Sequence, residues 1–456
     1  MAAGQLPEAP PVSGIFTFEE AAAVPPGERV ALLGGKAAGL VGMLEAGFPV
    51  PPGFTLTTRV GLAFLDSGAL SPQLEEGVRE RIARLERAAG RRFGGDSDRL
   101  LVSVRSGAAT SMPGMMDTLL NVGASADPYA ELFQAIGAVF SSWRSDRAVT
   151  YRRLHGLGEQ GSTAVTVQLM VRGDLAGPRL SGTGVLFTRD PSTGAREPVG
   201  EFIEGGLGSD LVDGTRTPDP LAVLEARAPG LHAELLGYGD RLEHALADMC
   251  DIEFTIEDGV LWLLQVRPGK RTDQAAARIA VELAEEGLIS RAEAVRRAAE
   301  RSGTVSVAEA GPSTVLCEGI AASPGLGSGH AVFDPDTAQD YADEGRPVVL
   351  VRDFTEPSDI HGMAVAEAVL TRTGGKMSHA AVVAREFGVA CVCGAAGLRI
   401  DEAAGEAWAG GHRIVLGDLI TVDGTSGRVH AGSVAARTDG PTEYQERLAA
   451  WSAEAT

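Results

Sequence analysis

Two kinds of hydrophobic pattern follow one another along the chain. Short apolar runs typical of strands alternate with stretches whose apolar positions recur every three to four residues, as in an amphipathic helix. Within residues 29–272 the strand candidates are Leu100–Val104, Ala164–Val171, Gly184–Phe187, Cys250–Ile256 and Val260–Val266. The helix candidates there are Ala37–Ala46, Pro72–Ala89 and Tyr129–Ser142. Because both kinds are interspersed without an internal repeat, the pattern predicts a mixed fold of helices and sheets.

The pattern changes along the chain and predicts five segments. Residues 273–301 carry apolar positions at helical spacing, interrupted at Glu286-Gly287, which predicts two helices, whereas 302–312 are small and polar. The segments are an irregular, proline-rich lead-in (1–28), a first large unit (29–272), a helical linker (273–312), a second compact unit rich in Val, Ala and Gly (313–434) and a tail with a surface helix (435–456).

Composition and charge exclude several classes of protein. The chain has 456 residues, 44% of them hydrophobic, and no apolar run approaches the roughly 18 residues of a membrane span. The net charge of −21 repels nucleic acid and anionic membranes, so we expect neither as a partner. The N-terminus lacks the basic and apolar regions of a signal peptide, which favours a cytoplasmic protein. The four cysteines lack the paired spacing of a zinc site and are expected to be buried free thiols.

The first candidate for chemistry is the glycine-rich segment LLGGKAAGL, residues 32–40. Glycines before a helix let backbone N–H groups and a lysine, here Lys36, approach phosphate. Only three lysines stand among the 40 basic residues, and Lys36 and Lys376 both follow a Gly-Gly pair, which favours a specific role. The Walker spacing is absent, and a glycine-rich turn with a surface lysine is an equally good interpretation of this segment alone.

A loop of small residues follows the strand candidate that leads to Arg105. In SVRSGAATSMPGMMDTLLN, residues 103–121, this loop would close over phosphates while Arg105 clamps them. The three methionines of the segment are more typical of core packing than of ligand binding.

The hairpin CDIEFTIEDGVLWLLQVR, residues 250–267, brings carboxylates together with an amide and a guanidinium. With a three-residue loop at Glu257-Asp258-Gly259, one face is entirely apolar and the other carries polar side chains, namely Asp251, Glu253, Thr255, Gln265 and Arg267. Carboxylate and amide oxygens suit Mg²⁺, and the guanidinium suits phosphate. The alternative is a half-exposed strand face whose charged side chains are solvated. When the hairpin is considered alone, this alternative is favoured.

His379 stands directly before a short apolar helix in the segment TRTGGKMSHAAVVAREFG, residues 371–388. The free N–H groups and positive potential of a helix N-terminus suit a histidine that becomes negatively charged on phosphorylation. The alternative is a histidine that caps the helix or packs in the core. For a single histidine considered by itself, this alternative is favoured.

Six segments taken together resemble the pyruvate phosphate dikinase family, in the same order and over residues 29–434. They are LGGKAAGLVGMLEAGFPVPPGFTLTT, SVRSGAATSMPGMMDTLLN, GTGVLFTRDPSTG, DIEFTI, LLQVRPGKRT and GGKMSHAAVVAR. The resemblance implies an α+β chain: an ATP-grasp nucleotide-binding domain with two subdomains (29–272), followed by a swivelling β/β/α phosphohistidine domain (313–434). It also implies that a histidine carries the β-phosphate of ATP, that AMP leaves, and that the γ-phosphate passes to inorganic phosphate or, as in the related phosphoenolpyruvate synthases, to water.

Carried over position by position, the resemblance also implies site residues and the cofactors ATP and Mg²⁺. Lys36 and Arg105 would bind phosphate and serve catalysis, and His379 would be the phosphorylated histidine. The other assignments are Gly114 and Thr118 in the loop over the triphosphate, Gln168, Met170 and Val171 in the hinge beside the adenine, Glu201 facing the nucleotide, Asp251, Glu253 and Gln265 as ligands of Mg²⁺, and Gln265 and Arg267 in the Mg²⁺–phosphate cluster.

Three features depart from the family pattern. The family's long insertion after the SMPGMMDT block is nearly absent, since residues 124–134 lead directly to the next helix. Met377 replaces the family's threonine before Ser-His, so a regulatory phosphorylation at that point is not expected, and Lys376 beside it is unusual. The family's C-terminal barrel, which binds pyruvate and phosphoenolpyruvate, needs about 250 residues, and only 24 residues follow Gly432.

The function predicted from these features is that of an ATP-dependent dikinase that phosphorylates His379 and passes the phosphoryl group to an acceptor held by a separate barrel protein. One alternative is a small-molecule kinase that binds its acceptor between the two domains; another is a non-catalytic phosphocarrier that senses nucleotide. The combination of Lys36, Arg105, Glu253, Arg267 and His379 argues against the last. Because a bound nucleotide blocks a second substrate, the second domain should swing as a rigid body about a hinge in or beside residues 302–312.

Overall fold

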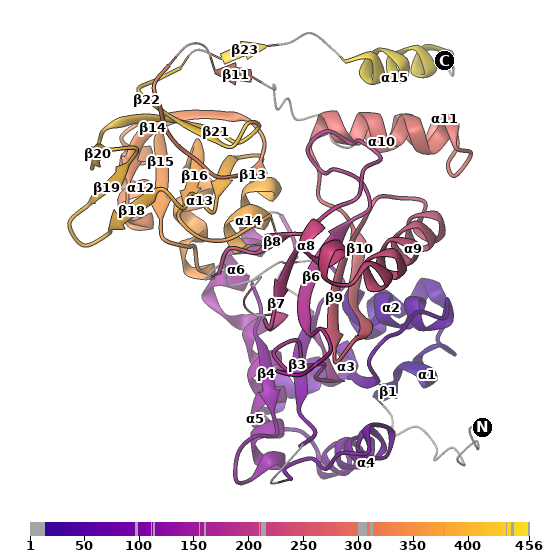
Figure 1. The fold of residues 1–456 in the computed structure, drawn as a ribbon. Helices are drawn as coiled ribbons and strands as arrows, with labels where there is room; N and C mark the ends of the chain where they lie inside the picture. Colours follow the sequence, from indigo (N-terminus) through magenta and orange to yellow (C-terminus); the bar gives the residue numbers. More distant parts are fainter. Residues whose placement is uncertain are drawn as a thin grey trace. The chain divides into compact units, whose positions relative to one another are not determined.

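The computed structural model shows a chain of mixed helices and strands (Figure 1). It describes residues 14–95, 99–110, 112, 115–154, 156–158, 161–208, 210, 216–299, 308–310, 313–376, 378–434, 436–438 and 442–454. Unit 1 comprises Met1–Val171 with Trp262–Gln265, and unit 2 comprises Arg172–Leu261 with Val266–Thr456. Among the residues that the structure describes, no helix is both long enough and apolar enough to cross a lipid bilayer.

Unit 1 is built on an antiparallel five-stranded sheet in the order β1-β2-β5-β3-β4. Its strands are β1 (Ile15–Thr17), β2 (Gly53–Leu56), β3 (Val102–Gly107), β4 (Thr118–Val122) and β5 (Ala164–Leu169). Its helical segments are α1 (Phe18–Ala21), α2 (Pro26–Glu45), α3 (Thr58–Ser67), α4 (Pro72–Ala89), α5 (Pro128–Ser141), η1 (Ser142–Arg144) and α6 (Asp146–Leu154). Alternate strand residues such as Val104 and Val167 share one buried core with Ile82 of α4 and Ile136 of α5. This core fixes the strand that carries Arg105.

Helix α4 illustrates how local sequence sets an element of unit 1. Ser71 caps its N-terminus by accepting a hydrogen bond from the Leu74 N–H, and Gly90 ends it in the left-handed conformation. Val78, Ile82 and Leu85 recur at helical spacing and are buried. The helix predicted over Pro72–Ala89 is therefore confirmed.

The first sheet of unit 2 has the order β10-β9-β6-β7-β8, and its inner pairs are antiparallel. We call it the nucleotide sheet, after the role that the resemblance gives to its residues. Its strands are β6 (Gly182–Phe187), β7 (Val199–Glu204), β8 (Asp219–Pro220), β9 (Cys250–Glu257) and β10 (Val260–Pro268), which also runs through unit 1. Two helices follow β8, namely α8 (Ala222–Arg227) and α9 (Pro229–Leu246).

The second sheet of unit 2 has eight strands in the order β12-β22-β21-β14-β15-β16-β17-β13. Its strands are β12 (Val315–Glu318), β13 (Ile320–Ser323), β14 (Leu326–Val332), β15 (Val348–Arg352), β16 (Ala368–Thr371), β17 (Ala390–Cys393), β21 (Leu419–Asp423) and β22 (Arg428–Ala431). The parallel strands β14 to β17 are connected through α12 (Pro335–Asp343), η2 (Pro357–Asp359) with α13 (Ile360–Val365), and α14 (His379–Phe387). Smaller sheets are formed by β18 (Leu398–Asp401), β19 (Glu406–Ala409) and β20 (His412–Val415), and by β11 (Ala308–Ala310) with β23 (Ala436–Thr438). We call residues 313–434 the histidine body.

Three helices of unit 2 pack on one another. They are α10 (Asp273–Glu285), α11 (Arg291–Ala299) and α15 (Glu443–Glu454), and they share a core that includes Val281, Ala294 and Trp451. The predicted break at Glu286-Gly287 is confirmed, since Gly287 adopts φ +77° between α10 and α11. Most of the predicted linker at 302–312 lies outside the described residues; residues 308–310 form β11.

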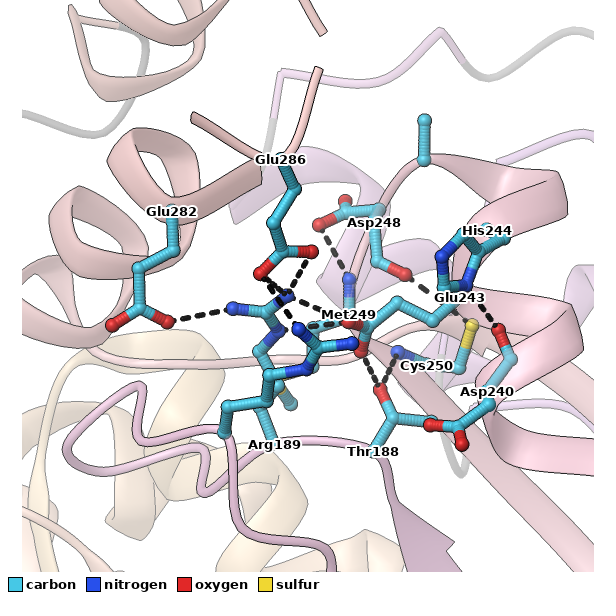
Figure 2. Close-up of polar contacts among 12 residues, drawn as sticks. Thr188, Arg189, Asp240, Glu243, His244, Asp248, Met249, Cys250, Glu282 and Glu286 are labelled. Carbon is cyan, nitrogen blue, oxygen red and sulfur yellow. Dashed lines mark hydrogen bonds and ion pairs between the residues drawn. The ribbon is translucent and has the colours of Figure 1, made fainter. Parts of the chain in front are cut away.

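A buried arginine ties α10 to the nucleotide sheet and α9 (Figure 2). Arg189, two residues beyond β6, has no exposed surface. Its guanidinium donates to Glu243 of α9 at 2.8 Å, to Glu282 of α10 at 2.7 Å and to Glu286 at 3.0 Å. Because a buried guanidinium is costly without partners, these carboxylates compensate its loss of hydration and fix α10 against the sheet.

Two other expectations from the sequence have opposite outcomes. The irregular lead-in expected over residues 1–28 is wrong for its described part, because β1 and α1 form there and α2 begins at Pro26. A capping box explains why α1 begins there. The Thr17 side chain accepts the Glu20 N–H, and the Glu20 side chain accepts the Thr17 N–H. The expectation of buried free thiols is confirmed for Cys250, Cys317, Cys391 and Cys393.

Candidate functional site

The glycine-rich segment bearing Lys36 forms a corner inside α2. Gly34 leaves the helical conformation with φ 75° and ψ 161°, and the N–H of Gly35 donates to the Ala108 carbonyl at 2.9 Å. A Cβ at Gly34 would lie 1.7 Å from the Gly107 carbonyl oxygen, so only glycine allows this approach. Half-buried Lys36 begins the helical stretch after the corner, beside the end of β3. The corner thus brings Lys36 to the loop that follows Arg105.

Arg105 lies near the end of β3, where it pairs with Thr118 of β4 and Thr166 of β5. Its side chain is half-buried, and one guanidinium nitrogen lies 3.5 Å from the Leu264 carbonyl oxygen, at the edge of hydrogen-bonding range. Thr118 is exposed at the start of β4. Gly114, the other residue assigned to the loop over the triphosphate, lies outside the described residues.

The segment expected beside the adenine runs from the end of β5. Gln168 is buried, and its amide nitrogen donates to the Pro51 carbonyl at 3.0 Å. The Met170 N–H donates to the Leu101 carbonyl at 2.9 Å, and both Met170 and Val171 are buried. Gln168 therefore supports the strand in this structure, while contact of Met170 and Val171 with adenine stays a prediction.

The hairpin between β9 and β10 has a two-residue loop, so the predicted three-residue loop is wrong. Asp258 and Gly259 alone lie between the strands, with φ 46° and 77°, as in a type I′ turn. Leu261 is accordingly buried, whereas Val260 is 48% exposed. Counted from this loop, strand alternation puts Glu253 and Gln265 on opposite faces, whereas counted from the bond between Asp251 and Arg267 it puts them on one face, so their joint role at Mg²⁺ stays what the resemblance implies.

Asp251 and Arg267 do meet at the far end of this hairpin. The Arg267 Nε donates to Asp251 Oδ2 at 2.8 Å, while Oδ1 of the buried Asp251 has no hydrogen-bond partner. Burial raises the pKa of Asp251, and the charge of Arg267 opposes that rise.

A buried carboxylate oxygen without a partner suits a cation. Within the described part of the chain, no three His, Cys, Asp or Glu side chains gather closely enough to hold a metal ion. This fits Mg²⁺ bound by one or two carboxylates together with substrate phosphates, rather than a closed protein cage. Asp251 and half-buried Glu253, two residues apart on β9, suit such an ion.

His379 is the first residue of α14 rather than the residue before it. Ser378 caps the helix by accepting from the Ala381 N–H, and Gly388 ends it in the left-handed conformation. The imidazole is 8% exposed, and its Nδ1 lies 2.9 Å from the Thr355 hydroxyl oxygen. This contact orients the ring and distinguishes Nδ1 from Nε2, which is the arrangement that attack by a single ring nitrogen needs.

The loop before His379 contacts the nucleotide sheet within unit 2. The Lys376 N–H donates to Glu201 Oε1 at 2.6 Å, and the Lys376 carbonyl accepts from Arg385 Nη2 at 2.6 Å. Arg385, on α14, is half-buried, and its other terminal nitrogen donates to the Ala322 carbonyl. Burial lowers the pKa of Arg385, and the charge of Asp251 opposes this shift. Met377, between Lys376 and the helix, lies outside the described residues.

The described site residues divide between the two units. Unit 1 holds Lys36, Arg105, Thr118, Gln168, Met170, Val171 and Gln265. Unit 2 holds Glu201, Asp251, Glu253, Arg267 and His379. The chain passes between the units after Val171 and again within β10, next to residues assigned to the nucleotide.

Comparison with known proteins shows the family in which these site residues occur. The model of the pyruvate phosphate dikinase AMP/ATP-binding domain matches residues 65–235 and 232–288, and that of the mobile domain of PEP-utilising enzymes matches residues 345–427. The pyruvate, phosphate dikinase of Rhizobium meliloti (strain 1021) is 39% identical over 92% of this chain. Those of Clostridium symbiosum and Entamoeba histolytica are 34% identical over 96% and 36% identical over 92%. The chain belongs to the pyruvate phosphate dikinase family.

This dikinase-family chain spans 58%, 60% and 57% of the lengths of these three relatives. Sequence reasoning missed two of its residues around the histidine. Thr355 gave no signal, because only the fold brings it to His379. Arg385 stands in the GGKMSHAAVVAR segment that carried the resemblance, and its position directly after the apolar run 380–384 was the available signal.

Proposed function

We propose that this chain is an ATP-dependent dikinase that phosphorylates its own His379 from the β-phosphate of ATP. The observation that carries the proposal is the setting of His379, at the N-terminus of α14 with Nδ1 held by Thr355 and its loop bonded to Glu201. The two family matches support it, because one is an AMP/ATP-binding domain and the other is the mobile domain that contains His379.

The proposed step is attack of His379 Nε2 on the β-phosphorus of ATP. An N–P bond forms, the bond between the β-phosphorus and the oxygen shared with the α-phosphate breaks, and AMP leaves with that oxygen. The γ-phosphoryl group then passes to inorganic phosphate, giving pyrophosphate, or to water, giving phosphate. Phosphohistidine remains on the chain.

The other site residues would bind and orient the nucleotide. Lys36, Arg105 and Arg267 supply positive charge for the triphosphate. Mg²⁺, held by Asp251 and Glu253, would neutralise charge on the phosphates. The hinge at Met170 and Val171 would adjoin the adenine, and the N-terminus of α14 would stabilise the charge that His379 acquires.

The decisive experiment follows phosphate from ATP labelled at either the β or the γ position, with Mg²⁺ present. We expect AMP, and a label on the protein that comes from the β position and is labile in acid but stable in base. His379→Ala should remove the label and keep ATP binding. Formation of ADP with label from the γ position alone would contradict dikinase chemistry.

A second measurement addresses the acceptor. Pyruvate is the first compound to test, because the relatives are named for it. The labelled chain is incubated with pyruvate, alone and with a candidate barrel protein. Loss of label only when both are present would support an acceptor held by a separate protein, and loss with pyruvate alone would refute it.

A further inference from the structure

The nucleotide sheet forms a hydrogen bond with a backbone group of the loop that precedes His379. Glu201 lies within β7, opposite Val185 of β6 and Pro220 of β8, and is 6% exposed. Its Oε1 accepts the Lys376 N–H at 2.6 Å. All of these residues belong to unit 2. A backbone N–H as the recognised group explains how lysine is tolerated at position 376, since its side chain takes no part in this bond.

Gly375 is glycine because of what lies against it. Gly374 adopts φ +98°, but Gly375 does not have a positive φ, so its own backbone conformation does not require glycine. A Cβ at Gly375 would lie 2.5 and 2.6 Å from the Glu201 carboxylate oxygens and 2.6 Å from Pro218 Cγ. Real Cβ contacts are not this short, and both neighbours belong to the nucleotide sheet or the loop that enters it. The close approach of this loop to Glu201 and Pro218 therefore depends on the absence of a side chain at position 375.

A second set of interactions connects this contact to the histidine helix. Arg385 of α14 donates to the carbonyl of Lys376, the residue whose N–H binds Glu201. Its guanidinium carbon lies 6.0 Å from the centre of the Phe187 ring, at the end of β6. Glu201, Lys376 and Arg385 thus form a continuous series of bonds from the nucleotide sheet to the helix that begins with His379.

We infer that Gly375 and Lys376 are the docking element of the histidine body and that Glu201 is a positioning residue which holds them on the nucleotide sheet. The inference rests on the proposed function, in which His379 visits the nucleotide and leaves again. Glu201 then acts on the histidine loop, through the Lys376 N–H, rather than on the nucleotide alone. The contact requires no side chain on position 375 and a hydrogen-bond acceptor at position 201.

The test measures docking without chemistry. Spin labels are placed on exposed Ala233→Cys of α9 and exposed Ala403→Cys of the histidine body, which is feasible because the four native cysteines are buried. Pulsed double resonance then gives the distribution of distances between the labels in the full chain. In this background Gly375→Ala should broaden the distribution and depopulate its docked peak. The matched control is Gly397→Ala, where an added Cβ meets nothing within 4 Å and the backbone has no positive φ, and it should keep the docked peak.

Two variants of Glu201 separate positioning from a purely charged role. Glu201→Gln keeps a side-chain oxygen that accepts the Lys376 N–H, so without nucleotide it should retain the docked peak. Glu201→Ala should lose it. If glutamine behaves like alanine, the acceptor role of Glu201 is refuted.

The rate of His379 phosphorylation supplies the functional measurement. Gly375→Ala should slow it by about a hundredfold, because misplacement of a nucleophile by 1 Å has effects of that order, while the affinity for ATP stays unchanged. A wild-type rate and distance distribution in Gly375→Ala would overturn the inference. If the wild type is itself never phosphorylated, the proposed function fails, and the distance measurements still decide whether the docking element exists.

Discussion

The hydroxyl of Thr355 lies within hydrogen-bonding distance of the His379 ring. If it selects the tautomer and orientation of the imidazole, Thr355→Val should slow phosphorylation by about tenfold, the equivalent of one hydrogen bond. Thr355→Ser keeps the hydroxyl and should restore most of the rate. The measurement is single-turnover labelling from β-labelled ATP, with ATP affinity measured in parallel. Equal rates for valine and serine would show that the 2.9 Å contact has no part in the reaction.

Arg189 allows a residue-scale prediction about stability. Replacing it with leucine would leave the buried Glu243, together with Glu282 and Glu286, without its guanidinium, at a cost of about 3–5 kcal/mol in the free energy of unfolding. The control is Arg196→Gln, because Arg196 bonds Glu286 from an exposed position and should contribute less than about 1 kcal/mol. Urea denaturation gives both values. Similar losses in the two variants would mean that burial of Arg189 does not strengthen its ion pairs.

At the scale of elements, the hairpin of β9 and β10 depends on two residues with positive φ. Gly259→Ala should destabilise the protein by about 1–2 kcal/mol, because alanine is strained in the left-handed region. Gly237→Ala, inside α9 and with nothing within 4 Å of an added Cβ, should instead stabilise it by up to about 1 kcal/mol. Denaturation curves of the two variants should move in opposite directions. A shift of both in the same direction would contradict the turn geometry.

This hairpin also shows where sequence reasoning stops. The five residues from Val260 to Leu264 are all apolar, so alternation could not fix the register of β10, and a three-residue loop gave the cleaner separation of an apolar from a polar face. The Asp-Gly pair is a strong signal for a two-residue loop, and both residues take the positive φ that such a loop requires. Helix α4, by contrast, has a cap, a clear apolar face and a terminal glycine, and its predicted bounds are those of the structure. The partner of His379 could not be predicted, because Thr355 reaches it only through the packing of the histidine body.

At the scale of the whole molecule, the expected chemistry requires the histidine body to dock and to leave. Glu201 and Asp251 are both buried carboxylates of the nucleotide sheet, and Glu201 bonds the loop three residues before His379. Phosphorylation would add a charge of about −1.5 to −2 to the docked face. Arg385 cannot offset this change, because it belongs to the same helix as His379 and attracts Asp251 equally before and after transfer.

Transfer of the phosphoryl group should therefore release the histidine body. The doubly labelled chain is phosphorylated, AMP is removed by desalting and Mg²⁺ by a chelator, and the distances are measured at low ionic strength. The docked peak should shrink relative to the unphosphorylated chain, and added salt should reverse part of the loss by screening the repulsion. His379→Ala taken through the same steps should stay docked, which separates phosphorylation from exposure to nucleotide. An unchanged docked peak in the phosphorylated chain would mean that an acceptor, rather than the charge of the phosphohistidine, draws the body away.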